Sequence, residues 1–249
     1  SFMTELCKYI GPDTDVPAGD IGTGKREIGY MFGQYKRIRN EFTGVLTGKG
    51  LSYGGSIGRT SATGHGLCYF TNKMLEQMGN TSFEGKKVIV SGTGNVGLYA
   101  VDAAIKLGAT VVGVNDISGT AYNAKGIKYD LLKKIKEDKR LLIKDYALQD
   151  TECTFTENPK DLWKIKCDIA LPCATQNEID LDDAKALVNN NVICVSEGAN
   201  MPCTLEATEY FIEHKIMYGP AKAANAGGVM VSGFEMSQNS MRLQWTDRR

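Results

Sequence analysis

The chain has 249 residues, of which 42% are hydrophobic, enough to bury the core of one large domain or of one domain and part of a second. Its 29 basic residues balance its 29 acidic residues, so the formal net charge is zero. Such a chain has no overall field to attract nucleic acid or an anionic membrane surface, and we expect neither as a partner. Any anion-binding site must therefore be local.

Other classes are disfavoured by particular residues. No apolar run of about 18 residues is present to span a bilayer, and the first residues, Ser1-Phe2-Met3-Thr4-Glu5, lack the features of a secretory signal. We expect a soluble, cytoplasmic protein. The seven cysteines form no C-x-x-C pair, and the two histidines, His65 and His214, lie far apart. This pattern favours free buried thiols and predicts no metal site and no serine–histidine triad.

The first predicted elements are a helix, a strand and a second helix. Apolar residues recur at helical spacing from Leu67 to Met78, and Gly79-Asn80 ends that pattern. Val88-Ile89-Val90-Ser91 predicts a buried strand. After a run of glycines, apolar residues from Val96 to Leu107 fall on one helical face, and Gly108 supplies a C-terminal stop.

Later segments continue the alternation. Short apolar runs predict further strands at 109–114, 169–171, 192–195 and 216–218, and 130–143 predicts a charged amphipathic helix on the outer surface of the sheet. Strands that alternate with helices are typical of βαβ units. The sequence therefore predicts an α/β fold with a doubly wound, parallel sheet that is buried on both faces.

A glycine-rich loop joins the strand at 88–91 to the helix that follows it. Gly92 permits a tight turn, Gly94 lets the backbone approach a pyrophosphate, and Gly97 lets helix and strand pack closely. Asp116 ends the next strand, as expected of a dinucleotide-binding unit. A flavin or S-adenosylmethionine site is the main rival to a nicotinamide site.

Several further segments resemble one family, the hexameric glutamate dehydrogenases of the Glu/Leu/Phe/Val dehydrogenase group. The matching stretches are Asp15-Val16-Pro17-Ala18-Gly19-Asp20-Ile21-Gly22, Thr47-Gly48-Lys49-Gly50-Leu51-Ser52-Tyr53-Gly54-Gly55-Ser56, Ala62-Thr63-Gly64-His65-Gly66, Leu171-Pro172-Cys173-Ala174-Thr175-Gln176-Asn177-Glu178, Glu197-Gly198-Ala199-Asn200-Met201-Pro202 and Ala223-Ala224-Asn225-Ala226-Gly227-Gly228-Val229. They extend from near the first residue to near the last.

The resemblance implies a domain division and a reaction. Residues 1–60 and 226–249 would form an incomplete α/β substrate domain, and residues 61–225 a Rossmann-like dinucleotide-binding domain. The implied reaction is the reversible oxidative deamination of L-glutamate to 2-oxoglutarate and ammonia, with hydride transfer to NAD(P). The full-length enzyme would be a homo-oligomer, expected to be a hexamer.

The resemblance also implies roles for single residues. Asp20 matches the catalytic aspartate, whose pKa burial in a closed cleft should raise. Ser232 matches a residue that contacts the substrate side-chain carboxylate, and Val229 is a second substrate-binding candidate. The cofactor-binding candidates are Thr63, Gly92, Gly94, Asn95, Val96, Gly97, Asp116, Ser118, Lys136, Ala174, Thr175 and Asn200.

The preferred nicotinamide follows from two opposing features. Asp116 by the usual rule favours NAD, because a carboxylate accepts from a 2′-hydroxyl and repels a 2′-phosphate. Members that resemble Asn115-Asp116-Ile117-Ser118-Gly119 include NADP-specific enzymes, and Lys136, with Lys133 or Lys134, offers phosphate partners. We therefore expect NADP, with NAD as the alternative.

The sequence also departs from the family pattern. Ser61 stands where the family carries a glutamate, and the family's lysine-bearing, glycine-rich segment and its C-terminal helix match nothing here. We therefore expect a fragment that binds the dinucleotide but turns over glutamate poorly. Two alternatives remain open, namely a non-catalytic dinucleotide-binding fragment and a branched-chain or aromatic amino acid dehydrogenase.

Overall fold

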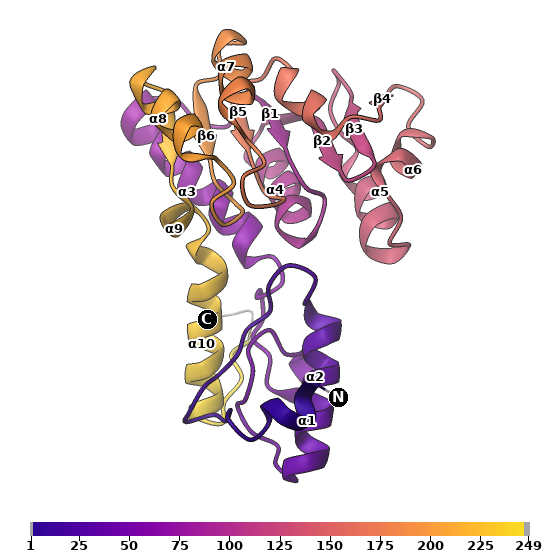
Figure 1. Ribbon diagram of the computed structural model, residues 1–249, viewed down its shortest axis with the longest axis vertical. Coiled ribbons are helices and arrows are strands. Elements are labelled where there is room, and N and C mark those ends of the chain that lie inside the picture. Colours follow the sequence, from indigo (N-terminus) through magenta and orange to yellow (C-terminus); the bar gives the residue numbers. More distant parts are fainter. Residues whose placement is uncertain (1, 247–249) are drawn as a thin grey trace. The chain divides into compact units, whose positions relative to one another are not determined.

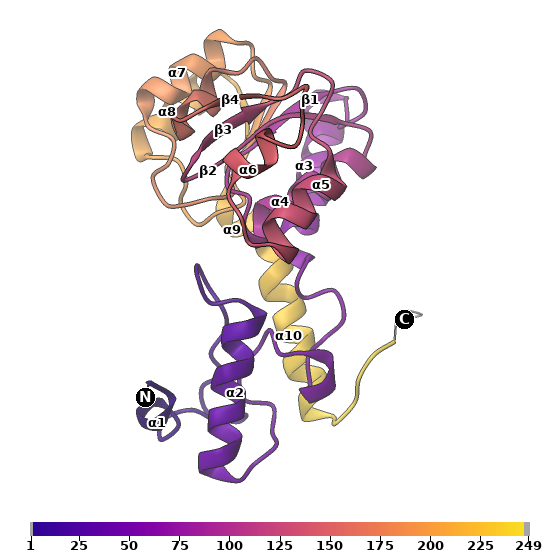
Figure 2. The ribbon, with the colours of Figure 1, turned by 90° about the vertical axis from the view of Figure 1, so that its right-hand side faces the viewer.

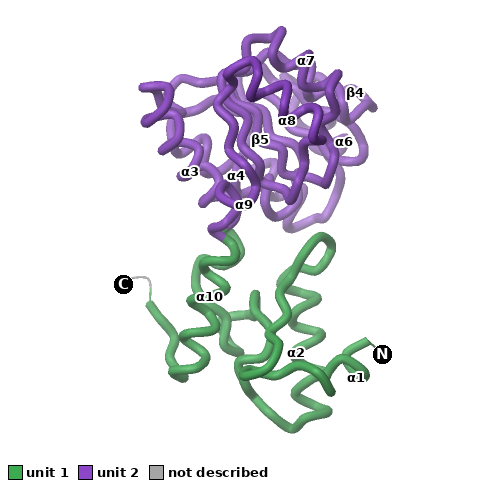
Figure 3. Tube along the Cα trace, turned by 60° about the vertical axis from the view of Figure 1, so that its left-hand side comes forward, with its two compact units in different colours: residues 1–62, 228–249 green, residues 63–227 purple. Residues whose placement is uncertain are grey.

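The structure is a computed structural model that describes residues 2–246. It divides into two compact units (Figure 3): unit 1 comprises residues 1–62 and 228–249, and unit 2 comprises residues 63–227. Within the described residues, no helix is both long enough and apolar enough to cross a membrane.

Unit 2 is built on a seven-stranded sheet in the order β4-β3-β2-β1-β5-β6-β7 (Figure 1). The five strands β1, β2, β5, β6 and β7 are parallel to their neighbours among themselves, as the sequence predicts. The strands are β1 (Lys87–Val90), β2 (Thr110–Asp116), β3 (Gly119–Tyr122), β4 (Thr154–Thr156), β5 (Ile169–Leu171), β6 (Cys194–Ser196) and β7 (Met217–Gly219).

The prediction of a wholly parallel sheet is wrong at one edge. Strand β3 is antiparallel to β2, and β4 is antiparallel to β3. Only a short turn separates Asp116 from Gly119, where the backbone φ of +144° is accessible to glycine, and a turn of that length can join only antiparallel strands. The sequence contains the required glycine, but the strand it begins is too short for its periodicity to be recognised.

Helices cover both faces of the sheet, as predicted (Figure 2). Val88 and Val90 face a core formed with α3, α4, α5 and α6, whereas Ile89 faces a second core formed with η3, α7 and α8. This alternation follows from the two-residue period of a strand. The helices of unit 2 are α3 (Ala62–Gly79), α4 (Asn95–Lys106), α5 (Tyr129–Lys133), η2 (Lys134–Asp138), α6 (Ile143–Ala147), η3 (Pro159–Lys164), α7 (Leu181–Asn189), α8 (Leu205–Glu213) and α9 (Ala221–Ala224).

The predicted continuous helix at 130–143 is interrupted. Helix α5 passes into the π-helical η2, and the chain then leaves helical geometry at Arg140, whose φ is +54°. Helix α6 begins at Ile143, where the backbone N–H donates to the Asp116 carboxylate at 2.9 Å. A tertiary contact with the end of β2 therefore decides where the chain turns, and the local periodicity cannot reveal it.

Unit 1 contains three helices in its described residues, together with most of α10, which starts within unit 2. They are α1 (Phe2–Leu6), α2 (Lys25–Arg39), η1 (Leu51–Tyr53) and α10 (Ala226–Ser240). A small core of its own packs α1 and α2 around Ile28, Phe32 and Tyr35. The assignment of residues 1–60 and 226–249 to substrate binding stays a prediction.

The core between α8 and the sheet gives a stability prediction. Phe211 is 0% exposed and stacks on Tyr218, whereas Leu205 on the same helix is 70% exposed. We expect Phe211→Ala to lower the free energy of unfolding by about 3–5 kcal/mol, because it removes a large buried side chain and leaves a cavity. The matched Leu205→Ala should change it by less than about 0.5 kcal/mol. Urea denaturation followed by circular dichroism measures both, and equal effects would contradict this packing.

Candidate active site

The glycine-rich loop at the end of β1 has three glycines in three different situations. Gly92 has a φ of +68°, and a Cβ there would lie 2.7 Å from the Ala174 Cα. A Cβ at Gly97 would lie 1.6 Å from the Gly92 carbonyl oxygen, whereas one at Gly94 would meet nothing within 4 Å. The first and third glycines are therefore required by the fold itself, and the second faces open space.

Helix α4 starts directly after Gly94, on the side of the loop that faces open space. Gly94 is the N-cap of α4, and its carbonyl accepts the first helical hydrogen bond from Leu98 at 2.9 Å. A helix start presents backbone N–H groups and the positive end of the helix dipole to an anion. Asn95 and Val96 occupy the first turn, so both predicted residues lie where a pyrophosphate would bind.

Side chains from neighbouring strands fix the loop. The Gly92 N–H donates to Asn115 Oδ1 at 2.8 Å, and the Asn115 amide donates to the Pro159 carbonyl at 2.8 Å. Because Asn115 lies on β2, this buried amide ties the loop to the neighbouring strand. These contacts within the protein hold the loop in its bent form.

The loops after β5 and β6 are joined to each other at the same edge of the sheet. Gly198 and Ala199 donate backbone N–H groups to the Pro172 carbonyl, at 2.9 and 3.0 Å. Asn225 donates its side-chain amide to Asn200 Oδ1 at 2.8 Å. Three predicted cofactor residues, namely the half-buried Ala174 and the exposed Thr175 and Asn200, lie on these loops.

Asp116 lies at the end of β2 and is engaged on both carboxylate oxygens. Oδ1 accepts from the Ser118 hydroxyl at 2.6 Å and from its N–H at 2.8 Å. Oδ2 accepts from Lys136 Nζ at 2.6 Å and from the Ile143 N–H at 2.9 Å. The structure therefore brings together three of the predicted residues, Asp116, Ser118 and Lys136, in one cluster.

The Asp116 carboxylate of this cluster stays ionised at neutral pH. Burial alone would raise the pKa of Asp116, but the hydrogen bonds from Lys136 and Ser118 outweigh it and hold the pKa below its usual value. The carboxylate is therefore neutralised locally by Lys136 rather than by protonation. A 2′-phosphate at this strand end would meet a paired charge and not a bare carboxylate.

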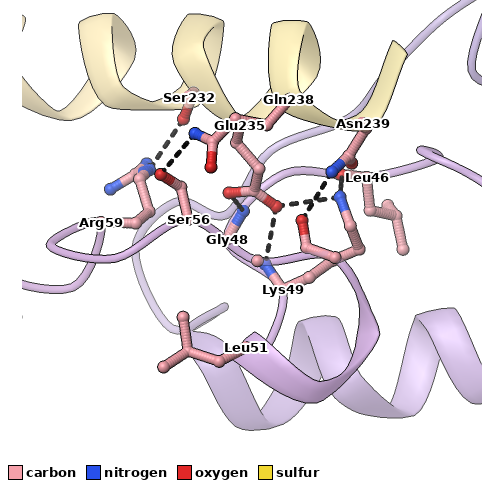
Figure 4. A network of polar contacts seen from close by, with 12 residues as sticks. Leu46, Gly48, Lys49, Leu51, Ser56, Arg59, Ser232, Glu235, Gln238 and Asn239 are labelled. Atoms are coloured by element: carbon pink, nitrogen blue, oxygen red, sulfur yellow. Dashed lines mark hydrogen bonds and ion pairs between the residues drawn. The ribbon is translucent and has the colours of Figure 1, made fainter. Parts of the chain in front are cut away.

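In unit 1, the predicted substrate residue Ser232 is paired with a residue that the sequence motifs did not single out. Arg59 Nε donates to Ser232 Oγ at 2.7 Å (Figure 4). The serine is 6% exposed, and the arginine is half-buried. Burial lowers the pKa of the Arg59 guanidinium, although the charge of Glu235 opposes this effect. A guanidinium beside a hydroxyl is a suitable site for a carboxylate.

A buried ion pair between Lys49 and Glu235 holds the helix that carries Ser232, α10, in place. Lys49 Nζ donates to Glu235 Oε1 at 2.9 Å and also to the Leu46 carbonyl (Figure 4). Both side chains of the ion pair are 0% exposed, and the Gly48 and Lys49 N–H groups also donate to the carboxylate. Glu235 lies three residues after Ser232, so the pair fixes the face of α10 that carries the serine.

The other two predicted residues of unit 1 are exposed. Asp20 lies in a turn, where its Oδ1 accepts from the Ile21 N–H at 2.8 Å. Within its own unit this turn is exposed, and the expected burial of Asp20 in a closed cleft stays a prediction. Val229 is 71% exposed at the start of α10. Thr63, in unit 2, is half-buried in the first turn of α3.

Sequence reasoning missed four residues that organise these sites: Asn115, Glu178, Asn225 and Arg59. The first three lie within or beside the matching stretches, so proximity to a motif was an available signal for them. Arg59 carried no such signal, because only the packing of α10 brings it to Ser232. The cysteines are unpaired, six buried and Cys153 half-buried, and among residues 2–246 no cluster of three potential metal ligands occurs.

Comparison with known proteins identifies the family of the chain. Residues 54–249 match the family described as Glutamate/Leucine/Phenylalanine/Valine dehydrogenase, and residues 1–37 match its dimerisation domain. The chain is 52% identical over 252 residues to the NADP-specific glutamate dehydrogenase of Helicobacter pylori strain J99, covering 99% of this chain and 56% of that protein. It is 51% identical over 249 residues to the NAD-specific glutamate dehydrogenase of Bacteroides fragilis, covering 99% and 56%.

Solved structures agree with the sequence relatives. The crystal structure of Plasmodium falciparum glutamate dehydrogenase superposes with a TM-score of 0.91 at 47% identity, covering 98% of this chain and 53% of that one. The chain therefore spans slightly more than half the length of the relatives that it matches. The phosphate loop, the strand-end loops and the family match agree, and the chain belongs to the Glu/Leu/Phe/Val dehydrogenase family.

Proposed function

We propose that the whole protein catalyses the reversible oxidative deamination of L-glutamate to 2-oxoglutarate and ammonia. The observation that carries this proposal is the phosphate loop, in which Gly92 and Gly97 are closely packed and Gly94 is open. About half of the residues are identical to those of proteins named glutamate dehydrogenase, which favours glutamate among the family's amino acids.

The residues of unit 2 fit a nicotinamide dinucleotide. The open side of Gly94 and the first turn of α4 would hold the pyrophosphate, and Asn200, positioned by Asn225, would orient the nicotinamide with Thr63, Ala174 and Thr175. When bound, the dinucleotide would accept a hydride from the substrate α-carbon. The protein's own contribution is to fix these groups before the cofactor arrives.

The residues of unit 1 fit the substrate side. Arg59 and Ser232 would hold the side-chain carboxylate of glutamate, with the guanidinium supplying charge and the hydroxyl supplying a donor. Asp20 would take a proton from the substrate amino group on its carboxylate, and Val229 would contact the substrate. General-base catalysis by Asp20 requires that it lose solvent when substrate binds, because its carboxylate is exposed in the structure.

We also propose NADP as the preferred dinucleotide, with NAD as the alternative. Asp116 is already bonded by Ser118, Lys136 and Ile143, so its charge no longer excludes a 2′-phosphate. The Lys136 ammonium has three N–H donors, so it can donate to a 2′-phosphate while it stays next to Asp116. Relatives at similar identity are named NADP-specific, NAD-specific and NAD(P)-specific, so the choice depends on this strand end.

The match of residues 1–37 to a dimerisation domain supports an oligomer. We propose that the whole protein is a cytoplasmic homo-oligomer, with a hexamer as the expected form.

Of the alternative activities, a branched-chain or aromatic amino acid dehydrogenase needs an apolar pocket, and the Arg59–Ser232 pair disfavours it. A non-catalytic binding protein is separated from an enzyme by an initial-rate assay of the whole protein with glutamate and NADP, and no detectable turnover would refute the proposed reaction.

The phosphate loop predicts opposite consequences for two alanine substitutions. Gly94→Ala should leave the free energy of unfolding within about 0.5 kcal/mol of the parent, because its Cβ meets open space. It should weaken dinucleotide binding about tenfold or more, because the Cβ occupies the approach of the pyrophosphate. Gly97→Ala should instead destabilise the protein by at least about 2 kcal/mol. Urea denaturation and fluorescence titration with NADPH test the pair, and unchanged affinity in Gly94→Ala would refute the assigned binding side.

The strand-end cluster predicts the effect of Lys136 on the choice of dinucleotide. Lys136→Ala should weaken NADP binding by roughly 10- to 100-fold, because a charge-assisted hydrogen bond to phosphate is lost. Binding of NAD should change less than about threefold. Lys164→Ala is the matched control, since that lysine pairs with Asp161 on η3. Equal losses for NADP and NAD in Lys136→Ala would contradict the assignment.

The Arg59–Ser232 pair predicts a selective effect on glutamate. In the whole protein, Ser232→Ala should raise the KM for glutamate about tenfold through the loss of one hydrogen bond, with little change in the KM for NADP. Ser237→Ala is the control, because its exposed hydroxyl bonds only to the Gly233 carbonyl of the same helix. If both variants kept the parental KM for glutamate, Ser232 would not contact the substrate.

A further inference from the structure

We propose that Glu178 is a positioning residue of the dinucleotide site and that it takes up a proton when the dinucleotide binds. This inference rests on the proposed dinucleotide binding, and it assigns to the site a titratable group that the reaction itself does not use. It stands on the contacts that Glu178 makes with the phosphate loop and with the loop after β5.

Glu178 connects the two loops that face each other at this edge of the sheet. Its Oε1 accepts from the Ser91 hydroxyl at 2.8 Å and from the Ala174 N–H at 3.0 Å. The same hydroxyl accepts from the Cys173 N–H at 2.8 Å. Ser91 directly precedes Gly92, and a Cβ at Gly92 would touch Ala174, so these contacts set the spacing between the loops.

The carboxylate is held by neutral donors alone. Burial raises the pKa of Glu178 to about 7, although the hydrogen bonds from Ser91 and from the Ala174 and Thr175 amides act in the opposite direction. No basic side chain forms an ion pair with it among residues 2–246. A partly buried carboxylate without a counter-ion gains a proton readily when another negative charge approaches.

The titratable groups that face Glu178 cannot replace it in this role. Asp183 of α7 adds a negative charge that favours the protonated form of Glu178, and Asp183 itself is paired with Lys160. Burial raises the pKa of the Cys173 and Cys203 thiols far above neutrality, so both stay uncharged. Glu178 is therefore the group of this cluster that can exchange a proton near pH 7.

An anionic dinucleotide on the adjacent loop supplies the approaching charge. The pyrophosphate would lie on the amides that follow Gly92, one residue beyond the Ser91 that bonds to Glu178. Repulsion in this partly buried site disfavours the charged carboxylate and so raises its pKa in the complex. The sign follows from linkage: a proton is taken up above pH 7, and affinity falls as the pH rises through this range.

The experiment is isothermal titration calorimetry of the purified protein with NAD, which lacks the titratable 2′-phosphate. Titrations at pH 7.5 in HEPES and in Tris, two buffers with different heats of ionisation, give the number of protons exchanged. We expect uptake of roughly half a proton per dinucleotide, and a dissociation constant that rises about tenfold between pH 6.5 and 8.5. Absence of binding of both NAD and NADP would refute the proposed function, whereas binding of either without proton uptake would refute only this inference.

Variants distinguish Glu178 from other proton acceptors. Glu178→Gln keeps the shape and an acceptor oxygen, so it should bind NAD with no proton uptake and with an affinity that is nearly independent of pH over this range. Glu213→Gln makes the same change on the exposed face of α8 and should behave as the parent. Ser91→Ala removes a bond that stabilises the carboxylate and should move the pH dependence to higher pH. Parental proton uptake in Glu178→Gln would overturn the assignment.

Discussion

The close approach of Gly97 to the Gly92 carbonyl oxygen is the constraint on which the dinucleotide-binding unit depends. A Cβ at Gly97 would lie 1.6 Å from that oxygen, so only glycine lets α4 start directly against β1. This contact directs the first turn of α4 toward the carboxyl edge of the sheet, where the loops after β2, β5 and β6 also begin. Ligands of open α/β sheets bind at that edge, because the strand ends and the helix starts meet there.

The surrounding polar contacts connect the loops at this edge. Asn115, Ser91 and Glu178 tie the phosphate loop to the neighbouring strand and to the loop after β5. Asp116 plays a similar role for the interrupted helix, because it binds both Lys136 and the start of α6. In unit 1, the Lys49–Glu235 pair does the same for Ser232. Each of these recognition groups is therefore positioned by a partly buried or buried polar partner.

Much of this architecture could be predicted from the sequence because it is encoded locally. The parallel strands and α4 follow from apolar periodicity, and the phosphate loop follows from three glycines with known steric roles. The antiparallel β3 and β4 were too short to recognise, and the break after η2 depends on the tertiary bond from Ile143 to Asp116. On the site, motif matches predicted Ser232 and Asp116. The contact of Arg59 with Ser232 depends on packing between distant segments, which no local pattern records.

The central claim is that the open side of Gly94 and the first turn of α4 receive the pyrophosphate of a nicotinamide dinucleotide. A crystal structure of the protein with NADP tests it most directly. The account predicts pyrophosphate oxygens within hydrogen-bond distance of the backbone N–H groups of Asn95 and Val96, with the Gly92 loop unchanged. Phosphates bound elsewhere in the chain, with this loop empty at saturating NADP, would contradict it.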